Sequence, residues 1–221
     1  MKIFYDVDTQ NDFMQEDGAL PVPLAKIIKL NLKKLTEYAF EKNIPVVGSV
    51  DLHYGNKEFA DLEKELKRNG GFFPDHCMKW TKGQEKIEET IMKRDNLYIP
   101  NYRVNIEDIG MSNWLNSYPY KSNNIVNVYF EKQTFDVFDN FYFETFIKNF
   151  KITEAVVYGV ATDYCVKDAV LGLINHGVKV KVVKDAIKGI DEKTEQQAIV
   201  LMKKAGADFV KLNEIICEVK K

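Results

Sequence analysis

The stretch from Glu154 to Val183, EAVVYGVATDYCVKDAVLGLINHGVKVKVV, decides the fold. It begins and ends with short runs rich in β-branched residues, which are typical of buried strands. Between these runs, the apolar residues of 166–174 recur at helical spacing, and Gly177 supplies the kind of stop at which helices often end. Strands that alternate with amphipathic helices are expected of a parallel sheet covered by helices. The stretch therefore predicts an α/β protein.

The same alternation continues along the rest of the chain. Amphipathic helices are predicted over 24–40 and 198–205, because apolar residues recur there at helical spacing. Six strands are expected, at Lys2–Val7, Pro45–Val50, Ile125–Glu131, Glu154–Val160, Val178–Val183 and Ala207–Lys211. We find no internal repeat, low-complexity tract or linker, so residues 1–221 are expected to form a single domain.

One stretch interrupts the alternation. Residues 101–124 carry aromatic and apolar side chains without the simple strand and helix pattern, and we interpret them as an insertion in the domain. A segment of this kind serves as a packing flap or a subunit contact, or it closes over a pocket as a lid. The sequence leaves these roles open.

Charge and composition narrow the class of partner. The chain has 31 basic and 33 acidic residues, a formal net charge of −2 and 45% hydrophobic residues. Without a basic excess, neither nucleic acid nor a membrane is expected as a partner, and a small molecule is favoured. We expect no signal peptide, and no apolar run reaches the ~20 residues that span a bilayer. Three cysteines at unrelated spacings suit a reducing compartment, so we expect a cytoplasmic protein. The sequence leaves open whether the protein forms a homo-oligomer.

Chemically active side chains follow four of the predicted strands. Ligands of such sheets bind outside the carboxyl ends of the strands, so these positions are candidates for a site. Asp8 follows the first strand, Asp51 and His53 the second, Lys132 the third and Cys165 the fourth. We therefore expect an acid, an ammonium group, a pair of metal ligands and a thiol to converge.

Cys165 lies where a cysteine is able to react. It is just inside a helix that follows a strand, where free backbone N–H groups and the helix dipole favour the thiolate. The alternative for Cys165 is a buried, inert cysteine. Asp8 could instead be a turn residue, and Lys132 a solvated surface lysine. Together, however, the three side chains make the set that a thiol amidase needs to move the thiol proton and to hold the groups in register.

Asp51, His53 and His76 are candidate metal ligands. Asp51 and His53 are two residues apart at a strand end, so both side chains point to the same face. His76 lies in a loop, and the three together would leave positions for water on a metal ion. Spacing alone is a weak signal, because a lone histidine is usually structural. A metal site and purely structural roles both stay open on the residues alone.

Several motifs together resemble the isochorismatase-like cysteine hydrolases, and the nicotinamidases in particular. The most specific is the nucleophile motif around Cys165, and the resemblance covers nearly the whole chain apart from the insertion. The matching segments are Asp8–Phe13 (DTQNDF), Gly18–Val22 (GALPV), Phe73–Cys77 (FPDHC) with Gly83, Gly159–Val166 (GVATDYCV) and Lys184–Ala186 (KDA).

The resemblance implies a three-layer α/β/α sandwich around a six-stranded parallel sheet of Rossmann-type topology. It also implies hydrolysis of nicotinamide to nicotinate and ammonia through a thioester on Cys165, a step of pyridine nucleotide salvage toward NAD. The implied cofactor is one divalent metal ion, zinc foremost, with iron and manganese as alternatives.

The resemblance further assigns roles to individual residues. Phe59 stands where some members have a third histidine, so water is expected to complete the metal shell. The implied residues are Asp8, Lys132 and Cys165 for catalysis, the backbone N–H groups of Ala161 and Cys165 for an oxyanion hole beside a cis Val160–Ala161 peptide bond, Phe13 and Phe73 for the substrate ring, and Asp51, His53 and His76 for the metal.

Two other functions compete with this interpretation. Another cysteine hydrolase of the same fold would act on a carbamoyl, ureido or other small amide group. Isochorismate is disfavoured as the substrate, because relatives that cleave it do not use the thiol. A flavodoxin-like binding protein would use Cys165 only for helix packing, and its thiol would not be alkylated unusually fast near neutral pH.

Overall fold

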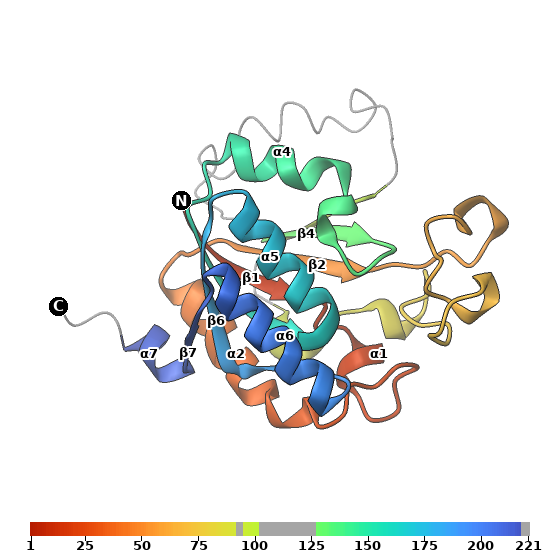
Figure 1. Ribbon diagram of the computed structural model, residues 1–221, viewed down its shortest axis with the longest axis horizontal. Coiled ribbons are helices and arrows are strands. Elements are labelled where there is room, and N and C mark those ends of the chain that lie inside the picture. Colours follow the sequence, from red (N-terminus) through yellow and green to blue (C-terminus); the bar gives the residue numbers. More distant parts are fainter. Residues whose placement is uncertain (92–94, 102–126, 218–221) are drawn as a thin grey trace.

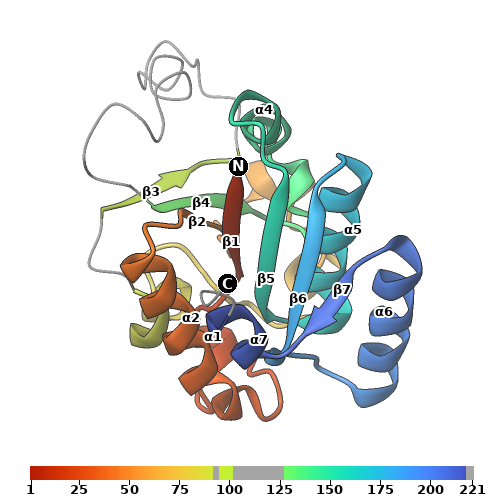
Figure 2. The ribbon, with the colours of Figure 1, turned by 90° about the vertical axis from the view of Figure 1, so that its left-hand side faces the viewer.

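The computed structural model describes residues 1–91, 95–101 and 127–217. Apart from Asn101, the predicted insertion at 101–124 lies outside the described residues. The described strands form a parallel sheet in the order β3-β4-β2-β1-β5-β6-β7 (Figures 1 and 2). The strands are β1 Lys2–Val7, β2 Val46–Asp51, β3 Asn96–Ile99, β4 Asn127–Lys132, β5 Glu154–Val160, β6 Lys179–Lys188 and β7 Asp208–Val210.

The prediction of six strands was wrong by one, although all six predicted strands are present. The additional strand is β3, which lies at the edge of the sheet and pairs with β4. It has only four residues, and three of them are partly or largely exposed. A short edge strand is covered on fewer sides than a central one, so it lacks the continuous apolar run by which the others are recognised.

Helices cover both faces of the sheet and complete the predicted three layers (Figure 2). One apolar core lies between the sheet and α4, α5 and α6, and a second lies between the sheet and α1, α2 and α7. None of the described helices is both long and apolar enough to cross a membrane. The helices are α1 Asn11–Met14, α2 Lys29–Glu41, α4 Phe141–Asn149, α5 Lys167–Asn175, α6 Glu192–Ala205 and α7 Leu212–Ile216.

The ends of the helices follow from local sequence. Helices α5 and α6 are each followed by a glycine with positive φ, Gly177 at 77° and Gly206 at 109°, as the sequence predicted. The helix expected over 24–40 starts later, because Leu24 adopts a left-handed conformation and a short 3₁₀ turn precedes α2. Leu24 and Ile27 consequently stay exposed rather than joining the apolar face of α2.

The topology places the four predicted strand ends side by side. Strands β4, β2, β1 and β5 are consecutive in the sheet, and all of them run in the same direction. Asp51 is the last residue of β2 and is paired in register with Lys132, the last residue of β4. The central strands are buried on both faces, so the side chains at their carboxyl ends are also screened from solvent.

Glu131 is a partly buried carboxyl group that directly precedes Lys132 in β4. Burial raises the pKa of Glu131 to about 7, and Lys79 opposes the rise only in part. This pKa is higher than that of a glutamate in the unfolded chain. The contribution of Glu131 to the free energy of unfolding is therefore fully present at pH values below the unfolded pKa. It is lost as the pH rises through about 7.

Glu131→Gln is therefore expected to raise the free energy of unfolding at pH 8, by roughly 1–3 kcal/mol, and to change it less at pH 5. Urea unfolding of both proteins at the two pH values measures the difference. An effect of equal size at pH 5 and pH 8 would contradict the raised pKa.

Candidate active site

Asp8, Asp51, Lys132 and Cys165 meet at the carboxyl edge of the sheet. All four side chains are buried. The ammonium group of Lys132 lies 2.9 Å from Asp8 Oδ2 and 3.4 Å from Cys165 Sγ, and it also contacts Asp51 Oδ1 directly. The structure thus brings the predicted acid, ammonium and thiol together and joins them to a predicted metal ligand.

The charges in this cluster are strongly coupled. Burial raises the pKa of Asp8, and the neighbouring Asp51 adds to the rise, while Lys132 opposes it. Burial alone would lower the pKa of Lys132, but Asp51 and Asp8 hold it well above its ordinary value. Burial also raises the pKa of the Cys165 thiol, and Lys132 is the neighbour that lowers it. Lys132 therefore stays charged beside the Asp8 carboxyl group and the Cys165 thiol.

Asp8 is fixed by the turn that follows β1. Its backbone is left-handed, with φ of 45°, and its N–H group donates to the carbonyl of Ser49 on the neighbouring strand. The hydroxyl of Ser49 donates to Asp8 Oδ1 at 2.7 Å, while Oδ2 faces Lys132. Both carboxylate oxygens thus have a polar partner, and one of them lies within 4.8 Å of the Cys165 sulfur.

Cys165 lies in a π-helical turn, Thr162–Val166, which leads from β5 into α5. Such turns are rare and often occur at functional sites. The turn is held by Asp163, whose carboxylate accepts hydrogen bonds from the N–H groups of Ile190 and Asp191. The Val160–Ala161 peptide bond before the turn is cis, as the resemblance implied.

A small pocket lies against the thiol. Phe13 and Phe73, the two residues predicted to contact a substrate ring, both line it. Phe135 and Tyr164 also line the pocket, with their ring centroids 5.0 Å apart, and sequence reasoning missed them. Tyr164 lies between Ala161 and Cys165, two predicted site positions, and an aromatic residue in that place is the signal that would have suggested it. The arrangement offers an aromatic, narrow site beside the Cys165 thiol.

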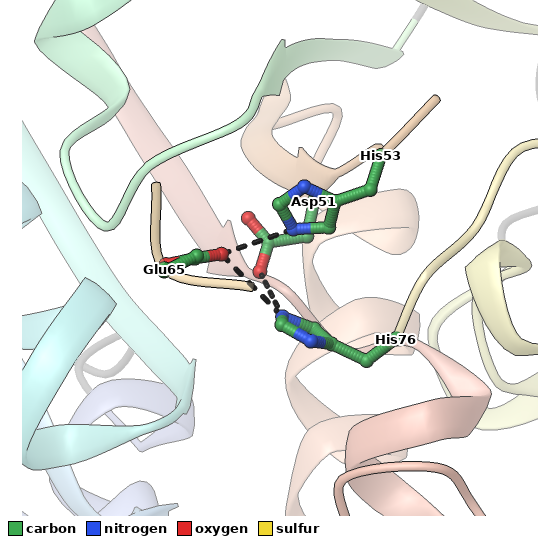
Figure 3. A group of neighbouring side chains, drawn as sticks. All are labelled: Asp51, His53, Glu65 and His76. Atoms are coloured by element: carbon green, nitrogen blue, oxygen red, sulfur yellow. Dashed lines mark ion pairs between the residues drawn. The ribbon is translucent and has the colours of Figure 1, made fainter. Parts of the chain in front are cut away.

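The predicted metal ligands also lie together, with one addition. Figure 3 shows Asp51, His53 and His76 converging with Glu65, which the sequence did not suggest. Glu65 Oε1 is 3.0 Å from His53 Nε2 and 3.5 Å from His76 Nε2. All four candidate ligand atoms lie within 4.8 Å of one another.

Glu65 takes the place in the cluster for which the sequence suggested water. It comes from an irregular loop, where no strand or helix period links it to the histidines. Phe59, at the position where a third histidine was considered, stacks on Tyr54 with ring centroids 4.1 Å apart. A carboxylate from farther along the same loop thus completes a four-residue set.

The donor atoms of this cluster fit a divalent metal ion. In the described part of the chain, the ring nitrogens of His53 and the carboxylate oxygens of Glu65 are buried without a hydrogen bond of good geometry. His76 Nδ1 lies 2.7 Å from the carbonyl of Pro74, which directs Nε2 into the cluster. Two imidazoles and two carboxylates suit zinc, iron or manganese.

A second acidic group, Asp8, Asp51 and Cys165, also has ligand atoms close together. Here the ammonium of Lys132 already lies between them and supplies the positive charge. The two groups share Asp51, so a metal ion is expected on the histidine side and the lysine ammonium serves the thiol side.

The chain is similar in sequence and fold to known hydrolases. Residues 117–214 match the isochorismatase domain family. The chain is 26% identical to the nicotinamidase of Escherichia coli K12 over 218 residues, which cover 91% of this chain and 89% of that protein. A nicotinamidase from Bacillus subtilis is 25% identical, with a TM-score of 0.69 and coverage of 95% of this chain and 99% of that one. The zinc complex of Pyrococcus horikoshii pyrazinamidase has a TM-score of 0.70 at 23% identity, covering 95% and 98% of the chains.

Proposed function

We propose that this chain, which resembles the nicotinamidases of the isochorismatase-like family, is a cysteine-dependent amide hydrolase that converts nicotinamide to nicotinate and ammonia. The observation that carries the proposal is the buried contact of Lys132 with Asp8, Cys165 and Asp51, which joins a nucleophile and a base to a metal-binding cluster. We further propose that residues 1–221 act as one domain.

The first half of the reaction forms a thioester. The Cys165 thiol passes its proton to Asp8, and the sulfur attacks the amide carbon, so that the C–S bond forms. The backbone N–H groups of Ala161 and Cys165 receive the oxyanion. Asp8 then gives the proton to the amide nitrogen as the C–N bond breaks, and ammonia leaves. Lys132 stays protonated throughout and limits the cost of negative charge on the acid and the sulfur.

The second half hydrolyses the thioester with the same residues. A water molecule gives a proton to Asp8 and its oxygen attacks the thioester carbon. The C–S bond breaks, the carboxylic acid leaves, and the proton on Asp8 returns to the sulfur. The acid and base therefore end the cycle as they began, and one water molecule is consumed for each amide bond.

The pocket favours a small, flat substrate. Phe13 and Phe73 line it together with the thiol, so a pyridine ring would lie between aromatic side chains with its amide directed at Cys165. Asp51, His53, Glu65 and His76 would hold the divalent metal beside this ring. A divalent metal ion bound there would supply a Lewis acid beside the substrate ring.

Metal binding provides a prediction that does not depend on activity. Protein purified without chelator is expected to carry one divalent metal ion per chain, and Glu65→Gln is expected to weaken metal affinity at least ten-fold by removing one anionic ligand. Elemental analysis and competition with a chelator measure both quantities. Glu58→Gln, an exposed change in the same loop, is the matched control and should leave them unchanged. Wild-type affinity in Glu65→Gln would exclude Glu65 as a ligand.

The substrate is tested by ammonia release from a panel of amides. Purified, metal-loaded protein should release ammonia fastest from nicotinamide and its planar ring analogues. A ureido or carbamoyl compound that is hydrolysed faster than every aromatic amide would instead assign the site to another cysteine hydrolase of this fold. Release from no member of the panel, with a slowly alkylated Cys165, would favour a binding protein.

A further inference from the structure

A second buried ion pair lies next to Thr9, the residue that follows Asp8. Asp6 of β1 and Lys86, which follows the 3₁₀ turn Lys82–Gln84, have Oδ2 and Nζ 2.9 Å apart, and their side chains are 1% and 2% exposed. Lys86 Nζ also lies 4.5 Å from the centre of the Tyr129 ring. Transfer of two charges out of water costs several kcal/mol per ion, and apolar replacements of such pairs are often as stable. The pair therefore calls for a role beyond stability.

Both charges of the pair act on the hydroxyl of Thr9. This hydroxyl donates to Asp6 Oδ1 at 2.8 Å and accepts from Lys86 Nζ at 2.7 Å, and it lies 2.8 Å from the hydroxyl of Thr90. A hydroxyl with a carboxylate on one side and an ammonium on the other has one favourable orientation. The ion pair thus fixes the side chain of Thr9 rather than merely burying it.

Thr9 is the residue between the catalytic base and the glutamine that holds a metal ligand. Its carbonyl accepts from the N–H group of Ile87 at 3.0 Å. On one side is Asp8 with its left-handed φ of 45°, a conformation that is unfavourable for a residue other than glycine unless its surroundings fix it. On the other side, Gln10 bonds both the N–H group and the carbonyl of Asp51, at 2.7 and 2.8 Å.

We propose that the Asp6–Lys86 ion pair is a positioning device, which acts through Thr9 to keep Asp8 in the conformation that faces Cys165. The inference rests on the proposed function, since it gives Asp8 the role of base. The substrate ring and the metal ion would contact other residues, so the pair should affect the chemical step more than substrate binding.

Thr9→Val tests the device with almost no change of shape, because only the hydroxyl is replaced. The expected result is a kcat reduced at least ten-fold, with KM within about two-fold of wild type. The negative charge of Asp8 raises the pKa of the Cys165 thiol, so a displaced Asp8 that acted only as a charge would speed alkylation. As a proton acceptor its displacement has the opposite effect, and we expect alkylation of Cys165 by iodoacetamide at pH 7 to slow at least five-fold, because the thiol proton loses its well-placed acceptor. Thr9→Ser, which keeps the hydroxyl, should restore both rates.

Two further variants separate positioning from stability. Thr36→Val removes another buried threonine hydroxyl, which bonds the carbonyl of Leu32 within α2, and should leave kcat and alkylation unchanged. The double variant Asp6→Leu with Lys86→Met replaces the ion pair by apolar groups and should unfold near the wild-type urea concentration. Its kcat and alkylation rate should nevertheless fall as they do in Thr9→Val.

The outcome that overturns the proposal is a folded Thr9→Val or double variant with wild-type kcat and wild-type alkylation of Cys165. Iodoacetamide needs no amide substrate, so its reaction reports on Asp8 even if the panel of amides finds no substrate. A wild-type protein without amidase activity, but with slowed alkylation in Thr9→Val, would therefore reject the proposed reaction and retain the positioning device.

Discussion

Cys165→Ala is expected to lower amide hydrolysis by a factor on the order of 10⁴ or more, because it removes the atom that forms the thioester. The variant should remain folded, since the change deletes one buried sulfur and places no charge in the core. Steady-state ammonia release and urea unfolding measure the two effects. The exposed Cys217 offers the control, and Cys217→Ser should keep wild-type activity. Cys165→Ala with near-wild-type turnover would exclude covalent catalysis by this residue.

Lys132→Met is expected to have the next largest effect, a loss of turnover on the order of 10²-fold or more. It keeps the aliphatic stem but deletes the ammonium that contacts Asp8, Asp51 and Cys165. Since Lys132 lowers the pKa of the Cys165 thiol, its loss should raise that pKa and slow alkylation near neutral pH. The unpaired buried carboxylates should also reduce the free energy of unfolding, by roughly 3–5 kcal/mol.

The pH dependence of Cys165 alkylation in wild type and Lys132→Met measures this effect. Lys179→Met, an exposed lysine at the start of β6, is the matched control. An arginine at position 132 is not a suitable control, because the planar guanidinium is wider than the ammonium it would replace. Superimposable alkylation profiles with unchanged turnover would mean that Lys132 has no part in the reaction.

The sequence predicted those parts of the fold that depend on local pattern. Central strands of a parallel sheet are continuous apolar runs, and β1 and β5 are recognisable for that reason. Because ligands bind beyond the carboxyl ends of such strands, Asp8, Lys132 and Cys165 could be expected to meet before any distance was known. The short edge strand β3 has no such run and was missed.

The features that the sequence did not predict depend on contacts between distant segments. Glu65 reaches the histidines from a loop without regular structure, so no residue spacing in the sequence predicts it as a ligand. Asp6 and Lys86 are eighty positions apart and pair only because the segment after Lys82–Gln84 packs along the end of β1. Charged residues are usually exposed, and a buried pair of this kind becomes visible only when both elements are placed.

Trapping with hydroxylamine tests whether the amide bond is cleaved through a thioester on Cys165. Metal-loaded protein is incubated with nicotinamide and increasing hydroxylamine, and nicotinate, the hydroxamate and ammonia are each measured. A thioester predicts that the hydroxamate grows at the expense of nicotinate while ammonia continues to be released, because hydroxylamine intercepts the acyl group before water does. If nicotinate is formed without any hydroxamate at every hydroxylamine concentration, while ammonia release is undiminished, the result would contradict a thioester intermediate.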